Sequence, residues 1–345
     1  MKIKFDGMEK EEQSINEMDM TDSDQMNETI SADGDKVKNF SLAFSISAPK
    51  NEEILIETSE AEKVIKLYNA ELEYYYFGIF NHHGSSGQEI MLFVKKFITS
   101  HLENNKVILK KLEDRSKIKG FLLEMIELAE KKLFKKKIDY KYSGCTLNHI
   151  FTYKNIAYTI NVGNCKSFMF RKRRNDKFTI DLSTDHVPEC KDERFRIYKN
   201  GGIIKRWEVD GAKVGPLRIW DKKIENGPGI RVTRSVGDSV ATRLGVISKP
   251  DIESIEITTS DVFLCVGNEE IFNKLYSTQI SYYISKFFSL FPQKIDQCSQ
   301  FIINKIRSKK FDVNRSSYLP TSNFQIGNPN LTEDGAIIIA FFNFY

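Results

Sequence analysis

Two long amphipathic segments stand close together in the first half of the chain, and they restrict its fold more than any other feature. Residues 86–103 carry apolar side chains near the i, i+3, i+4, i+7 spacing of one helix face, and residues 117–136 repeat the pattern. Short stretches rich in Thr, Ile, Phe and Tyr follow at 145–153, 156–162 and 167–171. Paired helices among runs of strands, without strict βαβ alternation, predict an α+β fold of antiparallel sheets with helices packed outside them.

The C-terminal part has a similar arrangement in a shorter form. Residues 276–291 and 295–306 each have a helical pattern, and Pro292 separates them. Residues 308–331 are polar and rich in Ser and Asn, as expected of a surface loop, and residues 336–344 are predicted to form a closing strand. We therefore expect another helix pair near the C-terminus.

Composition and cysteine usage limit the classes of protein to which the chain can belong. With 41% hydrophobic residues among 345, it can bury a sizeable core. The longest uncharged apolar run, residues 336–342, is far shorter than the ~20 residues that cross a bilayer, so we expect no membrane association. The five cysteines are scattered and form no Cys-x-x-Cys pair, which favours a reduced cytoplasmic location, with the nucleus as the alternative.

Charge divides the chain into two parts. Residues 1–35 hold eleven Asp and Glu against three Lys, a net charge of −8, so the total of +4 leaves +12 on the remainder. Residues 1–36 also have few side chains to bury, and we predict a disordered acidic tail there. Residues 37–345 are predicted to form one domain, because no long linker interrupts them. The tail either keeps the protein soluble or folds back on the basic body as a regulatory arm.

A series of short motifs runs in order from residue 77 towards the C-terminus. The motifs lie at residues 77–84, 143–146, 161–167, 182–188, 193–197, 229–238, 246–250, 261–272 and 333–338. Each is weak individually, but their order and spacing resemble those of the metal-dependent protein phosphatase 2C (PPM) family. The resemblance covers the chain from about residue 37 onwards and implies a PPM-type fold, a two-sheet antiparallel β-sandwich flanked by helix pairs.

The resemblance also implies an activity and a cofactor. Family members hydrolyse phosphoserine and phosphothreonine with two Mg²⁺ or Mn²⁺ ions, which activate a bridging water and neutralise phosphoryl charge. Such hard cations prefer anionic oxygen ligands. In this chain Asn81 occupies the position of the bridging carboxylate, and His82 follows where the family has a glycine whose carbonyl binds a metal.

The other family metal positions are also altered. Glu269 and Glu333 keep the charge of two late carboxylates but carry it one methylene further out, and Asn164 replaces an acid that helps to hold a further metal. Glu52 or its neighbour Glu53 corresponds to an early acid of the family, whose nearby phosphate-binding arginine is missing here. The candidate metal positions are therefore Asn81, His82, Glu269, Glu333, Glu52 and Asn164.

Two residues of the motifs keep the family's residue types. The resemblance makes His83 the candidate catalytic residue, a general acid that protonates the leaving alkoxide. Asp238 is interpreted as structural.

The substitutions lead to three hypotheses about function. The leading one is a catalytically impaired pseudophosphatase, a PPM-type phosphatase-like protein with a binding or regulatory role. The alternative is a weakly active Mg²⁺- or Mn²⁺-dependent protein serine/threonine phosphatase, which holds one or two ions through its remaining carboxylates. A third is a Zn²⁺ centre in which His82 or His83 joins Glu269 and Glu333. The expected cofactor is accordingly Mg²⁺ or Mn²⁺ if the family's metal is retained, and otherwise none.

The expected partner is a protein, either a phosphoprotein or a regulatory partner. Basic runs at 135–137 and 171–174 lack interleaved aromatic residues, so we interpret them as solvated patches and expect no nucleic-acid binding. Trp207 and Trp220 lie in an insertion, residues 205–227, where the family has a variable substrate-facing region. They are interpreted either as core residues or as anchors of a partner surface.

Overall fold

The computed structural model describes residues 40–47, 63–174, 176–209, 211–223, 229–308 and 335–344. The predicted acidic tail, the predicted loop beyond Ser308 and the candidate ligands Glu52, Glu53 and Glu333 lie outside these residues. Those features stay predictions.

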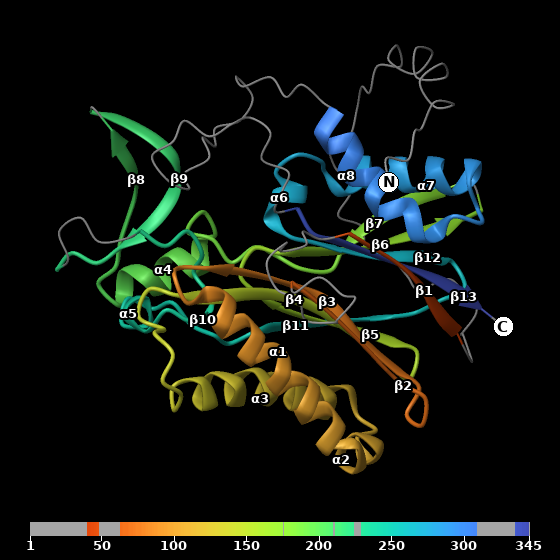
Figure 1. The fold of residues 1–345 in the computed structure, drawn as a ribbon, viewed down its shortest axis with the longest axis horizontal. Helices are drawn as coiled ribbons and strands as arrows, with labels where there is room; N and C mark the ends of the chain where they lie inside the picture. The colour runs from red at the N-terminus through yellow and green to blue at the C-terminus, as the bar shows by residue number, and fades with distance from the viewer. Residues whose placement is uncertain are drawn as a thin grey trace, which may run out of the picture. The chain divides into compact units, whose positions relative to one another are not determined.

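Two antiparallel sheets pack against each other in the centre of the described chain (Figure 1). In strand order, the first sheet consists of β1 (Phe40–Ser47), β13 (Ile337–Phe344), β12 (Asp261–Gly267), β6 (Lys166–Arg173) and β7 (Asp176–Asp181). The second consists of β11 (Asp251–Glu256), β5 (Ile156–Val162), β4 (Gly144–Tyr153), β3 (Tyr74–His83) and β2 (Val64–Asn69), and β10 (Val236–Gly237) pairs with β4. The predicted α+β fold with a two-sheet antiparallel sandwich is confirmed.

The side chains of β3 alternate between the two faces of the second sheet, as the pleat of a strand requires. Phe77 and Ile79 belong to the core between the sheets, whereas Tyr76 and Phe80 belong to the core under the helices. The pairing of β3 with β4 continues to His83, which lies opposite Gly144. The alternation therefore extends into the predicted site at the end of β3.

Helices cover the outer faces of both sheets (Figure 1). Against the second sheet lie α1 (Gly87–Asn104), α2 (Lys106–Lys111) and α3 (Arg115–Leu133), and against the first lie α7 (Ser277–Leu290) and α8 (Cys298–Ser308). All four helices predicted from periodicity are confirmed, although α3 ends at Leu133 and a 3-10 turn, Ile295–Gln297, precedes α8. Among the described residues, none of the helices combines the length and the apolar character needed to cross a membrane.

The insertion with the two tryptophans forms a hairpin. Its strands, β8 (Ile203–Val209) and β9 (Ala212–Trp220), pair antiparallel and extend away from the sandwich beside α4 (Lys191–Lys199) (Figure 1). The rings of Trp207 and Trp220 pack together with centroids 5.2 Å apart, and Trp207 keeps 36% of its surface exposed. The pair therefore stabilises the hairpin and lies outside the cores of the sandwich.

Candidate functional site

The candidate catalytic residue, His83, is paired with Asp238. Its Nε2 lies 2.7 Å from Asp238 Oδ2, and the hydroxyl of Ser235 also donates to this carboxylate oxygen. The Asp238 side chain is 3% exposed, whereas that of His83 is 35% exposed. An accessible imidazole is thus held in place by a buried carboxylate.

Asp238 reaches this position through an unusual backbone. It precedes the short helix α5 (Ser239–Thr242) in the left-handed conformation, with φ 46°, and its N–H donates to Ser143 O at 2.9 Å. The carboxylate lies against the Cα of Gly144, where an added Cβ would come within 2.3 Å of Asp238 Oδ2. The glycine after Ser143 therefore makes room for the carboxylate. The interpretation of Asp238 as structural did not include its contact with His83, which the structure shows.

Asn81 lies two positions before His83 on the same face of β3, the face that is directed between the two sheets. The backbone carbonyl of Asn81 accepts a hydrogen bond from Thr146 Oγ1 at 3.3 Å, and the same hydroxyl lies 3.7 Å from Cys165 Sγ. Burial raises the pKa of the Cys165 thiol to about 12, so this sulfur stays protonated and brings no charge. The two side chains beside the Asn81 backbone carbonyl, Thr146 and Cys165, are therefore both uncharged.

His82 belongs to the opposite face of β3. A Cβ added to Gly87, the first residue of α1, would lie 3.3 Å from His82 Cβ, so the His82 side chain lies beside the start of this helix. Adjacent strand residues direct their side chains to opposite faces, so His82 and His83 cannot both approach one ion on the Asn81 face. Of the two, His83 shares that face.

The candidate metal ligand Glu269 forms an ion pair with Arg231. It opens the short helix α6 (Glu269–Phe272), and its Oε1 contacts the Arg231 guanidinium and accepts a bond from Asn273 Nδ2 at 3.3 Å. The Glu269 side chain is 15% exposed and that of Arg231 is 26% exposed. Arg231 could not be recognised from the sequence, because an arginine inside a motif gives no spacing signal of its own.

Other charged groups lie close to this ion pair. Lys166 Nζ is 3.1 Å from Asp185 Oδ2, and burial raises the pKa of Asp185 although Lys166 opposes the shift. Burial and then the charge of Arg231 lower the pKa of Arg218, while Glu269 opposes them. Three cations and two carboxylates thus share this end of the sandwich, together with Glu270 in α6.

The remaining candidate ligand within the described residues is Asn164. It lies in the turn between β5 and β6, next to Cys165, and is 4% exposed. Of the six candidate metal positions, the structure describes Asn81, His82, Asn164 and Glu269. Asn81 and Asn164 are linked through Thr146 and Cys165, and Glu269 acts electrostatically on that thiol. His82 is on the other side of the sheet.

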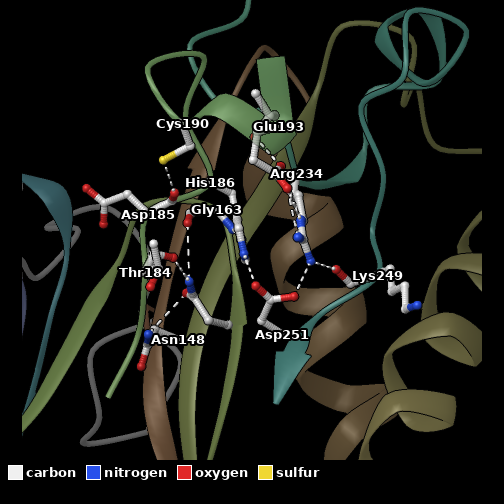
Figure 2. A network of polar contacts seen from close by, with 12 residues as sticks. Asn148, Gly163, Thr184, Asp185, His186, Cys190, Glu193, Arg234, Lys249 and Asp251 are labelled. Atoms are coloured by element: carbon white, nitrogen blue, oxygen red, sulfur yellow. Dashed lines mark hydrogen bonds and ion pairs between the residues drawn. The ribbon is translucent and has the colours of Figure 1, made fainter. Parts of the chain in front are cut away.

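A buried polar network holds the loops around this end of the sandwich (Figure 2). Glu193 of α4 accepts hydrogen bonds from the Arg196 and Arg234 guanidinium groups and from Thr233 Oγ1 at 2.5 Å. Burial alone would raise the pKa of Glu193, but these hydrogen bonds outweigh it and hold the pKa far below its usual range. The network fixes the segment that contains both Arg231 and Asp238.

Arg234 extends the network to the loop that contains His186. Its Nη1 donates to Asp251 Oδ1 at 2.6 Å, and the other oxygen of Asp251 lies 2.9 Å from His186 Nε2 (Figure 2). The N–H of Gly163 donates to His186 Nδ1 at 3.1 Å, which assigns the imidazole proton to Nε2. This histidine is 2% exposed and connects its own loop to the turn at Gly163 and to the start of β11.

The described residues are a poor match for two hard divalent cations. Such a centre needs several anionic oxygens. Asn81 and Asn164 bring neutral amides, His82 lies on the other face, and Glu269 is already paired with Arg231. Within the described part of the chain, His, Cys, Asp and Glu side chains form no group of three or more that could hold a metal ion.

Comparison with known sequences identifies relatives. The family model of protein phosphatase 2C matches residues 44–311. A probable protein phosphatase 2C 35 of Arabidopsis thaliana is 29% identical over 220 residues, which cover 60% of this chain and 62% of the relative. A probable protein phosphatase 2C 2 of Paramecium tetraurelia is 30% identical over 208 residues, which cover 58% and 64%. The match thus spans less than two thirds of these relatives' own length.

Solved structures with the same fold come from several organisms. The serine-threonine phosphatase 2C of Toxoplasma gondii has a TM-score of 0.64 at 14% identity, with coverage of 90% of this chain and 97% of that one. A C. elegans sex determining protein has a TM-score of 0.61 at 14% identity, with coverage of 89% and 66%. At these identities the similarity establishes the fold alone.

Proposed function

This chain belongs to the protein phosphatase 2C family, and we propose that it is a pseudophosphatase, which keeps the phosphatase fold for a binding or regulatory role. The family is generally Mg²⁺- or Mn²⁺-dependent and acts on phosphoproteins. The proposal concerns what this chain has kept of that chemistry.

The observation that carries the proposal is the residue at the end of β3. Asn81 stands on the same face as His83, and the resemblance of the motif aligns it with the family's bridging carboxylate. An amide oxygen donates a lone pair but carries no charge, so it compensates neither of two divalent cations. Without bound metal the site has no activated water, and His83 alone cannot supply the nucleophile.

The proposed partner is a protein, either a phosphoprotein or a regulatory partner, and the proposed location is the cytoplasm, with the nucleus as the alternative. All five cysteines are free, and Cys190 alone of them is not fully buried. Unpaired thiols of this kind are typical of a reducing compartment.

A second candidate function is a weakly active, metal-dependent protein serine/threonine phosphatase. It is favoured by the His83–Asp238 pair, because the candidate general acid is accessible and held by a buried carboxylate. In this alternative Glu269 would act together with Glu52 or Glu53 and with Glu333.

Hydrolysis of a phosphothreonine peptide over a Mn²⁺ titration distinguishes the two functions. We expect negligible turnover by the wild-type protein at every Mn²⁺ concentration. His83→Ala is the matched control, because it removes the candidate acid and leaves the candidate metal ligands unchanged. Mn²⁺-dependent turnover that disappears in His83→Ala would establish the phosphatase and reject the pseudophosphatase.

A further inference from the structure

The ion pair between Glu269 and Arg231 connects two segments that are each fixed by their backbones. Ile230 exchanges hydrogen bonds with Ile219 of β9 at 2.7 and 3.0 Å, and the N–H of Thr233 donates to His186 O at 2.9 Å. The backbone of Arg231 lies between these two anchors. Its presence beside the carboxylate is therefore a property of the loop path.

Glu269 is fixed from the other side. Asn268, which precedes α6, donates its N–H to Ala336 O at 3.1 Å and accepts the Ala336 N–H on its side chain at the same distance. The first residue of α6 is thereby tied to the strand β13 that follows Ala336. Both partners are thus held near each other by backbone contacts of their neighbours, and only their side chains have to be ordered to form the pair.

The surroundings add positive charge to this pair. Arg218 is close enough that Arg231 repels it and Glu269 attracts it. Lys166, at the start of β6, binds Asp185, the other carboxylate that interacts electrostatically with Glu269. A divalent cation that approached Glu269 would therefore meet the guanidinium groups of Arg231 and Arg218, whereas Asp185 offsets the charge of Lys166.

We propose that Arg231 is a built-in cation that takes the place of a divalent metal ion at Glu269, and so excludes Mg²⁺ and Mn²⁺ from this carboxylate. The inference rests on the proposed loss of the metal centre and gives it a second cause beside Asn81. It predicts that restoring the carboxylate at residue 81 is insufficient by itself. The arginine must also lose its charge before a metal ion binds tightly.

The test measures Mn²⁺ affinity by calorimetry on chelator-treated, full-length protein. Asn81→Asp alone is compared with Asn81→Asp/Arg231→Gln, and we expect the double variant to bind Mn²⁺ at least about tenfold more tightly, a factor equal to ~1.4 kcal/mol. Adding Glu269→Gln to the double variant should abolish the gain. Arg231→Lys in place of Arg231→Gln keeps the charge and should leave the affinity within about threefold of Asn81→Asp alone.

A control separates the local ion pair from net charge. Arg194 donates to the carbonyls of Pro188 and Glu189 at 2.8 and 2.9 Å, so Arg194→Gln in the Asn81→Asp background removes one charge elsewhere and should leave the Mn²⁺ affinity unchanged. The proposal would be overturned if Asn81→Asp and Asn81→Asp/Arg231→Gln bound Mn²⁺ with equal affinity while both proteins had a native circular dichroism spectrum. If Arg231→Gln does not fold, Arg231→Met is judged by the same comparison, since it keeps an apolar stem.

The wild-type protein supplies an independent readout. Stoichiometric Mn²⁺ binding and Mn²⁺-dependent peptide hydrolysis by the wild type would reject the pseudophosphatase. The role of Arg231 is decided by the difference between the two Asn81→Asp proteins. Metal binding by the wild type would also refute the exclusion by Arg231, whereas equal affinities of the two Asn81→Asp proteins would refute the role of Arg231 alone.

Discussion

Replacing Glu193 of α4 by glutamine should destabilise the fold, because this carboxylate holds together the loops around the site. The carboxylate is 7% exposed and accepts two hydrogen bonds from Arg196, at 2.8 and 2.6 Å, and one from Arg234 Nη2 at 2.8 Å. Thr233 Oγ1 adds another at 2.5 Å. Glu193→Gln keeps the shape but removes the only negative charge between two guanidinium groups.

The expected loss follows from what remains after the substitution. Breaking a buried ion pair by neutralising one partner costs about 3–5 kcal/mol, because the other charge stays buried without compensation. Here Arg234 still has Asp251, with Nη1 2.6 Å from Oδ1, so the lower part of that range applies. We therefore expect Glu193→Gln to reduce the free energy of unfolding by about 3 kcal/mol at pH 7.

The pH dependence of this loss has a definite sign. Hydrogen bonds from Arg196, Arg234 and Thr233 outweigh the effect of burial and depress the pKa of Glu193 in the folded state. A carboxyl with a depressed folded pKa contributes its stability above the unfolded pKa, near ~4.3, and loses it as the pH falls further. The difference between wild type and Glu193→Gln should thus be full at pH 7 and shrink below about pH 4.3.

Urea unfolding at pH 7 and at pH 3.5 measures both expectations. Asp192→Asn is the matched control, because Asp192 is the preceding residue of α4 and is exposed, so its effect should stay within about 0.5 kcal/mol. A loss below about 1 kcal/mol for Glu193→Gln, or a loss that is equal at both pH values, would refute the assignment of Glu193 as the anchor of these loops.

Two further predictions concern other parts of the fold. A Cβ at Gly229 would lie 2.6 Å from the Trp220 ring, so Gly229→Ala should displace the indole and shift the tryptophan fluorescence. We expect it to lower the free energy of unfolding, measured by thermal unfolding, by about 1–3 kcal/mol, and unchanged emission would contradict this. Burial, and to a lesser extent Lys95, lowers the pKa of His149 to about 3, and its Nδ1 lies 2.8 Å from the Tyr76 hydroxyl. Because a histidine in the unfolded chain protonates near ~6.5, burial of neutral His149 should lower the free energy of unfolding as the pH falls from there towards 3. An NMR signal of the His149 imidazole that titrates above about pH 5 would disprove this.

Periodicity alone predicted the helices because their apolar stripes are continuous. In α1 the apolar residues of one face are fully buried in the core under the second sheet, and they are Ile90, Met91, Val94, Ile98 and Leu102. The periodic residues in the sequence are therefore the ones that pack on the sheet. The strands were found for the same reason, since β4 and β5 are buried along nearly their whole length. The hairpin β8–β9 was missed because only a few of its side chains, among them Ile204 and Ile219, pack on a small cluster with α4, and so few buried positions give no clear alternation in the sequence.

The site could be predicted only in part, because sequence position does not reveal partners. Aligned motifs located Asn81, His83 and Glu269, and the structure gives each a definite face or contact. Arg231 was missed because an ion pair between residues 38 positions apart depends on two loop paths. The side-chain directions of His82 and His83 follow once this segment is known to be a strand, but no strand was predicted there from the sequence.

The pair of His83 and Asp238 allows a last test of whether the site is still built as a unit. If Asp238 serves the fold alone, its effect on stability should be independent of His83. The 2.7 Å contact between Nε2 and the buried carboxylate predicts instead that the two are coupled. In a double-mutant cycle of His83→Ala and Asp238→Asn, measured by urea unfolding, we expect a coupling free energy of about 1–2 kcal/mol. Additive effects, within about 0.3 kcal/mol, would mean that the carboxylate does not hold the imidazole in solution. Coupling in a protein without phosphatase activity would instead indicate that His83 is retained for the architecture or for binding, because neither role requires a metal ion.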